Sequence, residues 1–146
     1  MLFIITWSEY YIGRSECDFA QYPERAPEGV VRDAGCVKLF FGFESGSQRI
    51  LHKMGKRITV EQCERAADLC HKLDIDFYTS YIINYFGETD EDLELTEKLI
   101  RRTKPTTLAI NRFSPIPGSK DYELHKEEID ASVKTLHDWT THVSRT

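Results

Sequence analysis

The sequence has few cysteines, and none has the spacing of a metal or redox motif. Cys17, Cys36, Cys63 and Cys70 lie far apart, with neither a CxxC nor a CxxxCxxC pattern among them. Because no secretory signal is recognisable, we expect reduced thiols rather than a disulfide framework. Cys63 and Cys70 fall two turns apart on a predicted helix, where small apolar side chains typically face the core. We therefore predict packing roles for these two and assign no metal ligand.

The chain also lacks a long apolar run and a surplus of basic residues. No segment approaches the roughly 18 to 20 apolar residues of a membrane span, and residues 1–5 are instead predicted to form a short buried strand. There are 19 Lys and Arg against 24 Asp and Glu, which gives a formal net charge of -5 at pH 7. Phosphate backbones bind surfaces rich in Lys and Arg, so we expect no nucleic-acid partner. Because no long apolar run is present, we expect no membrane partner either. A cytoplasmic protein with an unknown small-molecule substrate is predicted.

The pattern of apolar residues predicts an α/β fold with parallel strands. At 146 residues the chain fits one domain and is too short for a complete eight-unit α/β barrel. Apolar, β-rich runs at 37–43, 77–84 and 107–113 alternate with stretches of helical period, as in consecutive βα units. Their nearly continuous apolar character is typical of strands covered on both faces. A barrel and a doubly wound sheet both fit this pattern.

Two helices have clear start signals. Thr59 and Gln62 have the capping-box spacing, followed by an apolar face that includes Cys63 and Cys70. The second helix begins at Thr89 with an acidic first turn, and Leu93, Leu99 and Ile100 are predicted to form its buried stripe. A further strand is predicted within residues 4–11, a short helical end at 30–34, and a closing helix at 127–143.

Three segments that follow the predicted strands carry candidate functional residues, because ligands bind at the carboxyl ends of parallel strands. They are residues 42–47, 84–89 and 111–119. Glu44 can accept hydrogen bonds from an amino group or a ribose hydroxyl, while Gly46 lets the backbone approach a ligand and Ser47 can cap a helix. The alternative is a solvent-exposed strand end followed by an ordinary turn.

The other two segments leave similar alternatives. Gly87 and Thr89 form a turn and a helix cap whether or not a ligand binds, but the backbone at 82–83 can present an edge to a purine. Arg112 precedes a rigid Pro-Ile-Pro-Gly turn and can meet a carboxylate.

Taken in order, these segments resemble the radical S-adenosylmethionine (radical SAM) superfamily, in particular the branch often fused to a cobalamin-binding domain. The residues that carry the resemblance are Ala34-Gly35-Cys36, the run from Phe41 to Leu51, the run from Met54 to Thr59, Tyr81 to Thr89, and Pro115 to Tyr122. The likeness covers about residues 33–122, and more weakly 5–14 as a third strand. The chain is expected to be a single domain with this core and a helical segment at 123–146.

The resemblance implies a partial TIM-type (β/α)6 barrel, of which this chain supplies about strands 3 to 6. In the family a CxxxCxxC loop after the first strand holds a [4Fe-4S] cluster, which cleaves S-adenosylmethionine to start radical chemistry. By resemblance, Glu44 and Ser45 contact the polar part of the cofactor, the edge formed by Ile82, Ile83 and Asn84 lies near adenine, and Asn111 and Arg112 line the cavity. No catalytic residue is assigned.

The sequence departs from the family pattern in two places. The segment with the cluster cysteines is absent, and Asn84, Tyr85 and Phe86 stand where glycine, leucine and proline are common. These departures leave two hypotheses. The chain is either a fragment or truncated member of a radical SAM enzyme, or an inactive half-barrel that acts as a binding or structural module. A half-barrel exposes a sheet edge, which favours a dimer or a covering partner. A small doubly wound domain with a phosphate ligand is a third reading, without a glycine-rich loop to support it.

Overall fold

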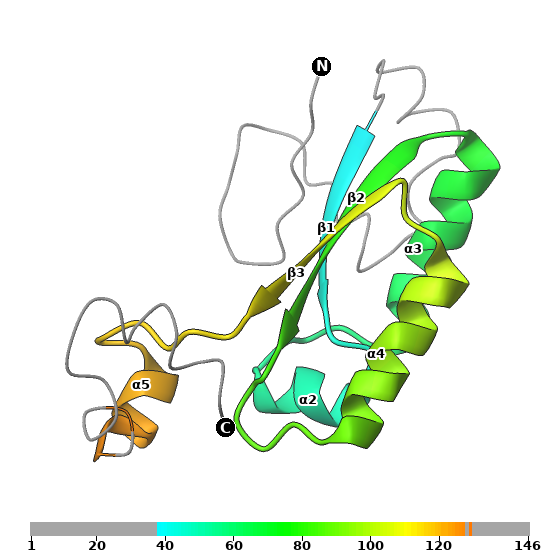
Figure 1. The fold of residues 1–146 in the computed structure, drawn as a ribbon. Coiled ribbons are helices and arrows are strands. Elements are labelled where there is room, and N and C mark those ends of the chain that lie inside the picture. The colour runs from blue at the N-terminus through cyan, green and yellow to red at the C-terminus, as the bar shows by residue number, and fades with distance from the viewer. Residues whose placement is uncertain (1–37, 128, 130–146) are drawn as a thin grey trace.

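Three parallel strands form the centre of the molecule. The computed structural model describes residues 38–127 and 129. The strands are β1 (Lys38–Glu44), β2 (Asp76–Ile83) and β3 (Thr107–Arg112), and they lie side by side in the order β1-β2-β3 (Figure 1). All three predicted strands are confirmed to within one residue at each end.

Helices α3 (Val60–Leu73) and α4 (Asp90–Thr103) pack against the same face of this sheet (Figure 1). A doubly wound sheet has helices on both faces, whereas successive helices of a barrel all lie outside the strands. The described part of the chain therefore has the arrangement of a barrel segment. The expectation of strands covered on both faces is wrong for β3, and it is not confirmed for β1 and β2, whose described helices lie on one face. β1 alternates between buried and half-buried side chains, and β3 is mostly exposed.

The hydrophobic core lies between the sheet and α3. Phe41 stacks on Phe43 with ring centroids 5.5 Å apart, and Phe77 meets Phe41 edge-on at 6.1 Å. Facing them, α3 presents small side chains, including Cys63 and Cys70, which are fully buried. Small residues allow the helix to approach the aromatic layer closely, and each fully buried Phe contributes roughly 1.5 to 3 kcal/mol through its removal from water. The predicted core-facing position of the two cysteines is confirmed.

The helix starts follow the sequence signals. Thr59 caps α3 with the full capping box, since its side chain accepts from the Gln62 amide and the Gln62 side chain accepts from the Thr59 amide. Ser47 caps α2 (Gln48–Lys53), and α4 begins after Thr89 as predicted. A short helix that the sequence did not predict, α5 (Lys120–Leu124), is capped by Ser119.

The buried side of α4 is more polar than the sequence indicated. Leu99 is buried as predicted and the half-buried Ile100 packs against the core, but Leu93 is half-buried and is not part of that core. The other buried positions are Asp92, Thr96 and Thr103. The predicted apolar stripe is therefore wrong in part. The physical reason is that Asp92 and Thr96 face the polar loop after β1 rather than the apolar core.

Among the described residues β1 and β3 are the two edge strands of the sheet, and in β3 Leu108 is 41% exposed and Ile110 is 52% exposed. That a dimer or a partner covers an open edge stays a prediction. The predicted strand at 4–11, the helical end at 30–34, Cys17 and Cys36 lie outside the described residues, as does most of the helix at 127–143. Among the helices that the structure describes, none combines the length and apolar character needed to cross a bilayer.

Candidate functional site

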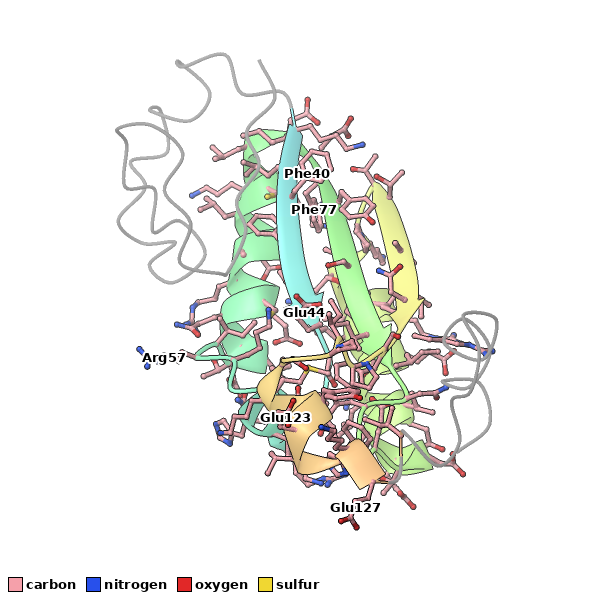
Figure 2. The ribbon with its side chains drawn as sticks, turned by 90° about the vertical axis from the view of Figure 1, so that its left-hand side faces the viewer. Phe40, Glu44, Arg57, Phe77, Glu123 and Glu127 are labelled. Carbon is pink, nitrogen blue, oxygen red and sulfur yellow. The ribbon has the colours of Figure 1, made fainter. Side chains whose placement is uncertain are left out.

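The carboxyl ends of the three strands bring the candidate residues to one edge of the sheet. Ile82 pairs with Asn111, and Ile83 pairs with Arg112, while Glu44 ends β1 beside Tyr81 after an irregularity in the ladder. Figure 2 looks onto the face opposite α3 and α4 and shows Glu44 at this end of β1. Because paired residues of parallel strands share a face, Ile82 and Asn111 lie on the face opposite α3 and α4. Ile83 and Arg112 lie on the helix-covered side. The structure thus gathers the candidates at one edge but divides them between two faces.

Glu44 has a carboxylate that is already paired. Its Oε1 atom lies 3.0 Å from the Lys56 ammonium, and the two side chains are 12% and 26% exposed. The residue also has a left-handed backbone, with φ 61°, so the chain turns sharply out of the strand here. A cationic ligand group at this position would share the carboxylate with Lys56 or displace it.

Asn84 takes the same left-handed conformation at the end of β2, with φ 61°. Its amide donates to Glu88 Oε2 at 2.5 Å, which closes the loop after the strand. The other oxygen, Glu88 Oε1, is buried and has no hydrogen-bond partner among the described residues. Burial raises the pKa of the Glu88 carboxyl, opposed by the hydrogen bonds from the amides of Asn84 and Tyr85. Sequence reasoning treated Glu88 only as part of a turn and missed this acceptor.

Ser45 and Gly46 lie against α4. Ser45 is fully buried, and its hydroxyl lies 3.3 Å from Thr96 Oγ1, which also accepts from the Gly46 amide at 2.9 Å. A Cβ atom on Gly46 would lie 2.3 Å from the backbone oxygen of Leu95. The close backbone approach that the sequence predicted towards a ligand is therefore made to the α4 backbone. The Ser45 contact with a cofactor stays a prediction.

Asp92 connects the loops that follow β1 and β2. It accepts from the Ser47 hydroxyl at 2.6 Å and from the Thr89 amide at 2.9 Å, and it forms an ion pair with Arg49. Burial by itself would raise its pKa, but the hydrogen bonds from Ser47, Arg49 and Thr89 outweigh burial and hold the pKa of Asp92 well below its usual range. The acidic first turn of α4 was visible in the sequence, but which of its acids is buried was not.

Tyr85 and Phe86, the bulky departures from the family pattern, pack towards α5. The Tyr85 ring meets Phe113 at 4.7 Å, and its hydroxyl lies 3.0 Å from Asp121 Oδ1. Phe86 stacks on His125 with centroids 3.6 Å apart. Burial, followed by the hydrogen bond to Asp121, raises the pKa of Tyr85 to about 12. The aromatic side chains therefore attach α5 to the loop after β2.

The described cysteines do not fit an iron–sulfur cluster. Cluster ligation needs several thiolates that converge on one point. Cys63 and Cys70 are buried in the core, and burial raises the pKa of Cys63 to about 12. Within residues 38–127 and 129 no group of three or more His, Cys, Asp or Glu side chains is placed to hold a metal ion.

Comparison with known proteins supports one family. The family model of the radical SAM superfamily matches residues 30–100. A tRNA-2-methylthio-N(6)-dimethylallyladenosine synthase of Wolbachia pipientis is 35% identical over 94 residues, which are 63% of this chain and 21% of that protein. A threonylcarbamoyladenosine tRNA methylthiotransferase of Thermotoga maritima is 34% identical over 86 residues, covering 58% of this chain and 20% of that protein. The chain thus spans about a fifth of the length of these relatives.

The fold is also similar to that of a radical SAM enzyme of known structure. The radical S-adenosylmethionine methyltransferase TsrM of Kitasatospora setae, determined with cobalamin and a [4Fe-4S] cluster bound, matches with a TM-score of 0.65 at 18% identity. The match covers 92% of this chain and 24% of that protein. Together with the three parallel strands, it confirms the predicted α/β fold, a partial barrel with parallel strands.

Proposed function

Because the chain belongs to the radical SAM superfamily, we propose that it supplies one wall of an S-adenosylmethionine site in a larger radical enzyme. The observation that carries the proposal is the convergence of Glu44, Ile82 and Asn111 at the carboxyl edge of three adjacent parallel strands. This edge is where ligands bind in α/β barrels.

The donors and acceptors at this edge fit the chemistry of S-adenosylmethionine. The cofactor carries an ammonium group, ribose hydroxyls and an adenine amino group, all of which donate hydrogen bonds. The edge offers acceptors in return. They are the Glu44 carboxylate, which already binds an ammonium group from Lys56, and Oε1 of Glu88, which has no hydrogen-bond partner in the part of the chain that the structure describes. A buried acceptor without a partner is costly, so a ligand donor there would be favourable. We propose that Glu44 binds the polar part of the cofactor and that the edge from Ile82 to Asn84 lies beside adenine.

The roles of the remaining candidates follow from their faces. Asn111 shares with Ile82 the face opposite α3 and α4, so its side chain lines the cavity in this proposal. Arg112 lies on the helix-covered side, and its proposed contribution is therefore to the strand end rather than to the cavity wall. Ser45 contributes through its position between Glu44 and the helix α4, because its hydroxyl is engaged by Thr96.

When bound to a [4Fe-4S] cluster, S-adenosylmethionine supplies radical chemistry in this family. Because the described cysteines do not fit a cluster, we propose that its ligands come from an upstream region or a partner. Anaerobic reconstitution of this chain with iron and sulfide tests the proposal. We expect no stoichiometric iron–sulfur absorption band. A full complement of cluster bound through Cys17, Cys36, Cys63 or Cys70 would contradict it.

The reaction that we propose for the whole enzyme is transfer of a methylthio group, since the two relatives described above carry this activity in their names. Those relatives act on tRNA. This chain has a net charge of -5, and we propose that contacts with an RNA backbone are made mainly by regions outside it. Fluorescence anisotropy with labelled tRNA at 150 mM salt checks this: weak binding that salt abolishes is expected, and tight salt-resistant binding would contradict it.

Calorimetric titration with S-adenosylmethionine tests the central proposal. The parent chain should bind, and Glu44→Gln should weaken binding about tenfold because a charge-assisted hydrogen bond is lost. Glu97→Gln is the matched control, since Glu97 is exposed and, among the described residues, pairs with Arg101 on the same helix. Binding that Glu44→Gln leaves unchanged would contradict the assignment. An absence of heat from the parent would favour the inactive half-barrel.

A further inference from the structure

The two loops that carry the proposed cofactor contacts are held together by one buried side chain. The loop after β1 contains Ser47, and the loop after β2 contains Thr89; both donate hydrogen bonds to Asp92 of α4. We propose that Asp92 is a positioning residue that fixes the Glu44 loop relative to the Asn84 loop. The effect on a cofactor rests on the proposed function, because these loops carry the proposed S-adenosylmethionine contacts. The positioning itself rests on the contacts of Asp92.

Asp92 makes more contacts than its place in the helix requires. It is the third residue of α4, where a capping side chain needs to accept only from the cap amide of Thr89. Asp92 also accepts from the Thr89 hydroxyl at 3.0 Å and the Ser47 hydroxyl at 2.6 Å. Arg49 completes the set. Its guanidinium pairs with Asp92 and donates to the Gly87 carbonyl at 3.0 Å. One carboxylate oxygen, Oδ1, thus binds the loop after β1, and the other, Oδ2, binds the loop after β2.

Burial makes this arrangement specific. Asp92 is only 4% exposed, so bulk water cannot take the place of a hydrogen bond that is removed there. One turn further along α4, Thr96 accepts from the Gly46 amide and donates to the Asp92 carbonyl. Asp92 and Thr96, four residues apart on α4, thus form a polar stripe against which the loop at 45–47 packs.

The same contacts reach the start of α2. Ser47 donates to Asp92 through its hydroxyl, and the same oxygen lies 3.4 Å from the Ile50 amide that it caps. Loss of Asp92 therefore frees the Ser47 hydroxyl and loosens the segment immediately after Glu44. Because the ion pair of Glu44 is with Lys56 and not with Asp92, the effect on a ligand is indirect.

The test uses Asp92→Asn in the full chain, with Asp90→Asn as matched control. The control makes the same chemical change two residues away, at an exposed position. In Asp92→Asn an amide NH2 replaces one acceptor oxygen and faces donors. We expect the dissociation constant for S-adenosylmethionine, corrected for the folded fraction from near-ultraviolet circular dichroism, to rise about tenfold. A merely structural role would lower the melting temperature and leave the corrected constant within about twofold of the parent, which would overturn the proposal.

Amide hydrogen exchange separates this inference from the proposed function. In Asp92→Asn, exchange in the segments 44–47 and 87–89 should accelerate at least several-fold, whereas the amides of β2 should keep their protection. Unchanged exchange in both segments would overturn the positioning role even if S-adenosylmethionine binds. If the parent binds no cofactor, the proposed function fails while this measurement still decides the positioning role. Should Asp92→Asn not fold, Ser47→Ala removes one donor only, and the same loop exchange is expected with a smaller increase.

Discussion

The loops after β1 and β2 are held in place by a different kind of contact from the segment after β3. The first two meet at Asp92 and Thr96, where buried polar groups satisfy one another under α4. The segment after β3 is attached largely by aromatic contacts, since Phe113 packs on Tyr85 and Phe86, and Phe86 stacks on His125. One hydrogen bond, from the Tyr85 hydroxyl to Asp121, lies beside these rings. Directional hydrogen bonds define a single arrangement more strictly than stacked rings do. We infer that the polar contacts at Asp92 and Thr96 fix the position of the loop after Glu44, whereas the aromatic contacts hold the segment with α5 against the loop after β2. We call these two groups of contacts the polar side and the aromatic side.

Among the polar contacts, the approach of Gly46 to the backbone of α4 leaves the least room for a larger side chain. Gly46→Ala would place a methyl group 2.3 Å from the Leu95 carbonyl oxygen, and backbone atoms cannot move aside cheaply. We expect a loss of about 3 kcal/mol in the free energy of unfolding, measured by urea denaturation.

Gly118→Ala is the matched control on the aromatic side. Gly118 has φ 86° and nothing within 4 Å of an added Cβ, so only backbone strain of about 1 kcal/mol is expected. Equal losses for the two variants would contradict the claimed difference between the two sides.

Acid should weaken the polar side first. The pKa of Asp92 is depressed in the folded state, so its contribution to stability is present above the usual aspartate pKa and is lost as the pH falls below it. The difference in unfolding free energy between the parent and Asp92→Asn should therefore be largest near pH 6 and shrink towards pH 3. Urea unfolding at several pH values measures this, and a difference independent of pH would show that the carboxylate charge does not stabilise the loops.

Alkali should act on the aromatic side. The pKa of Tyr85 is raised to about 12, so its contribution is present below the ordinary tyrosine pKa and is lost as the pH rises towards 12. Tyr85→Phe removes the hydroxyl's contacts with Asp121 and with the Lys53 carbonyl oxygen but keeps the ring contact with Phe113. We expect a loss of about 1 kcal/mol at pH 7 that disappears at high pH. Tyr78→Phe serves as control, because Tyr78 is half-buried on the face of β2 opposite α3 and α4 and contacts Phe40 through its ring. If Tyr85→Phe lost more unfolding free energy than Gly46→Ala, the aromatic contacts would contribute more than the polar contacts, which would contradict this comparison.

Residues with strong local preferences were predicted well. The capping box of Thr59 and Gln62 and the boundaries of the three strands depend on neighbours in sequence, and the structure agrees with each. The positions of Cys63 and Cys70 in the core followed from helical periodicity. The motif order over about residues 33–122 also indicated the radical SAM superfamily, whose family model matches residues 30–100, because motif spacing is a property of the linear chain.

The burial of Asp92 and the contact made by Gly46 could not be predicted from neighbouring residues in the sequence. Asp90, Glu91 and Asp92 look alike in the sequence, yet Asp92 alone of the three is buried, because the loop after β1 packs on that side of α4. Gly46 was expected to approach a ligand, but it approaches the backbone at Leu95. Both depend on residues about fifty positions away.

The sequence by itself determined the α/β class, the starts of α3 and α4 and the family, because local propensity and motif order are encoded by neighbouring residues. Only the tertiary structure decided which face of the sheet is covered, how the candidate residues divide between the two faces, and which acid of α4 joins the loops. These depend on how distant segments pack, and packing selects among side chains that are chemically equivalent until they meet their partners.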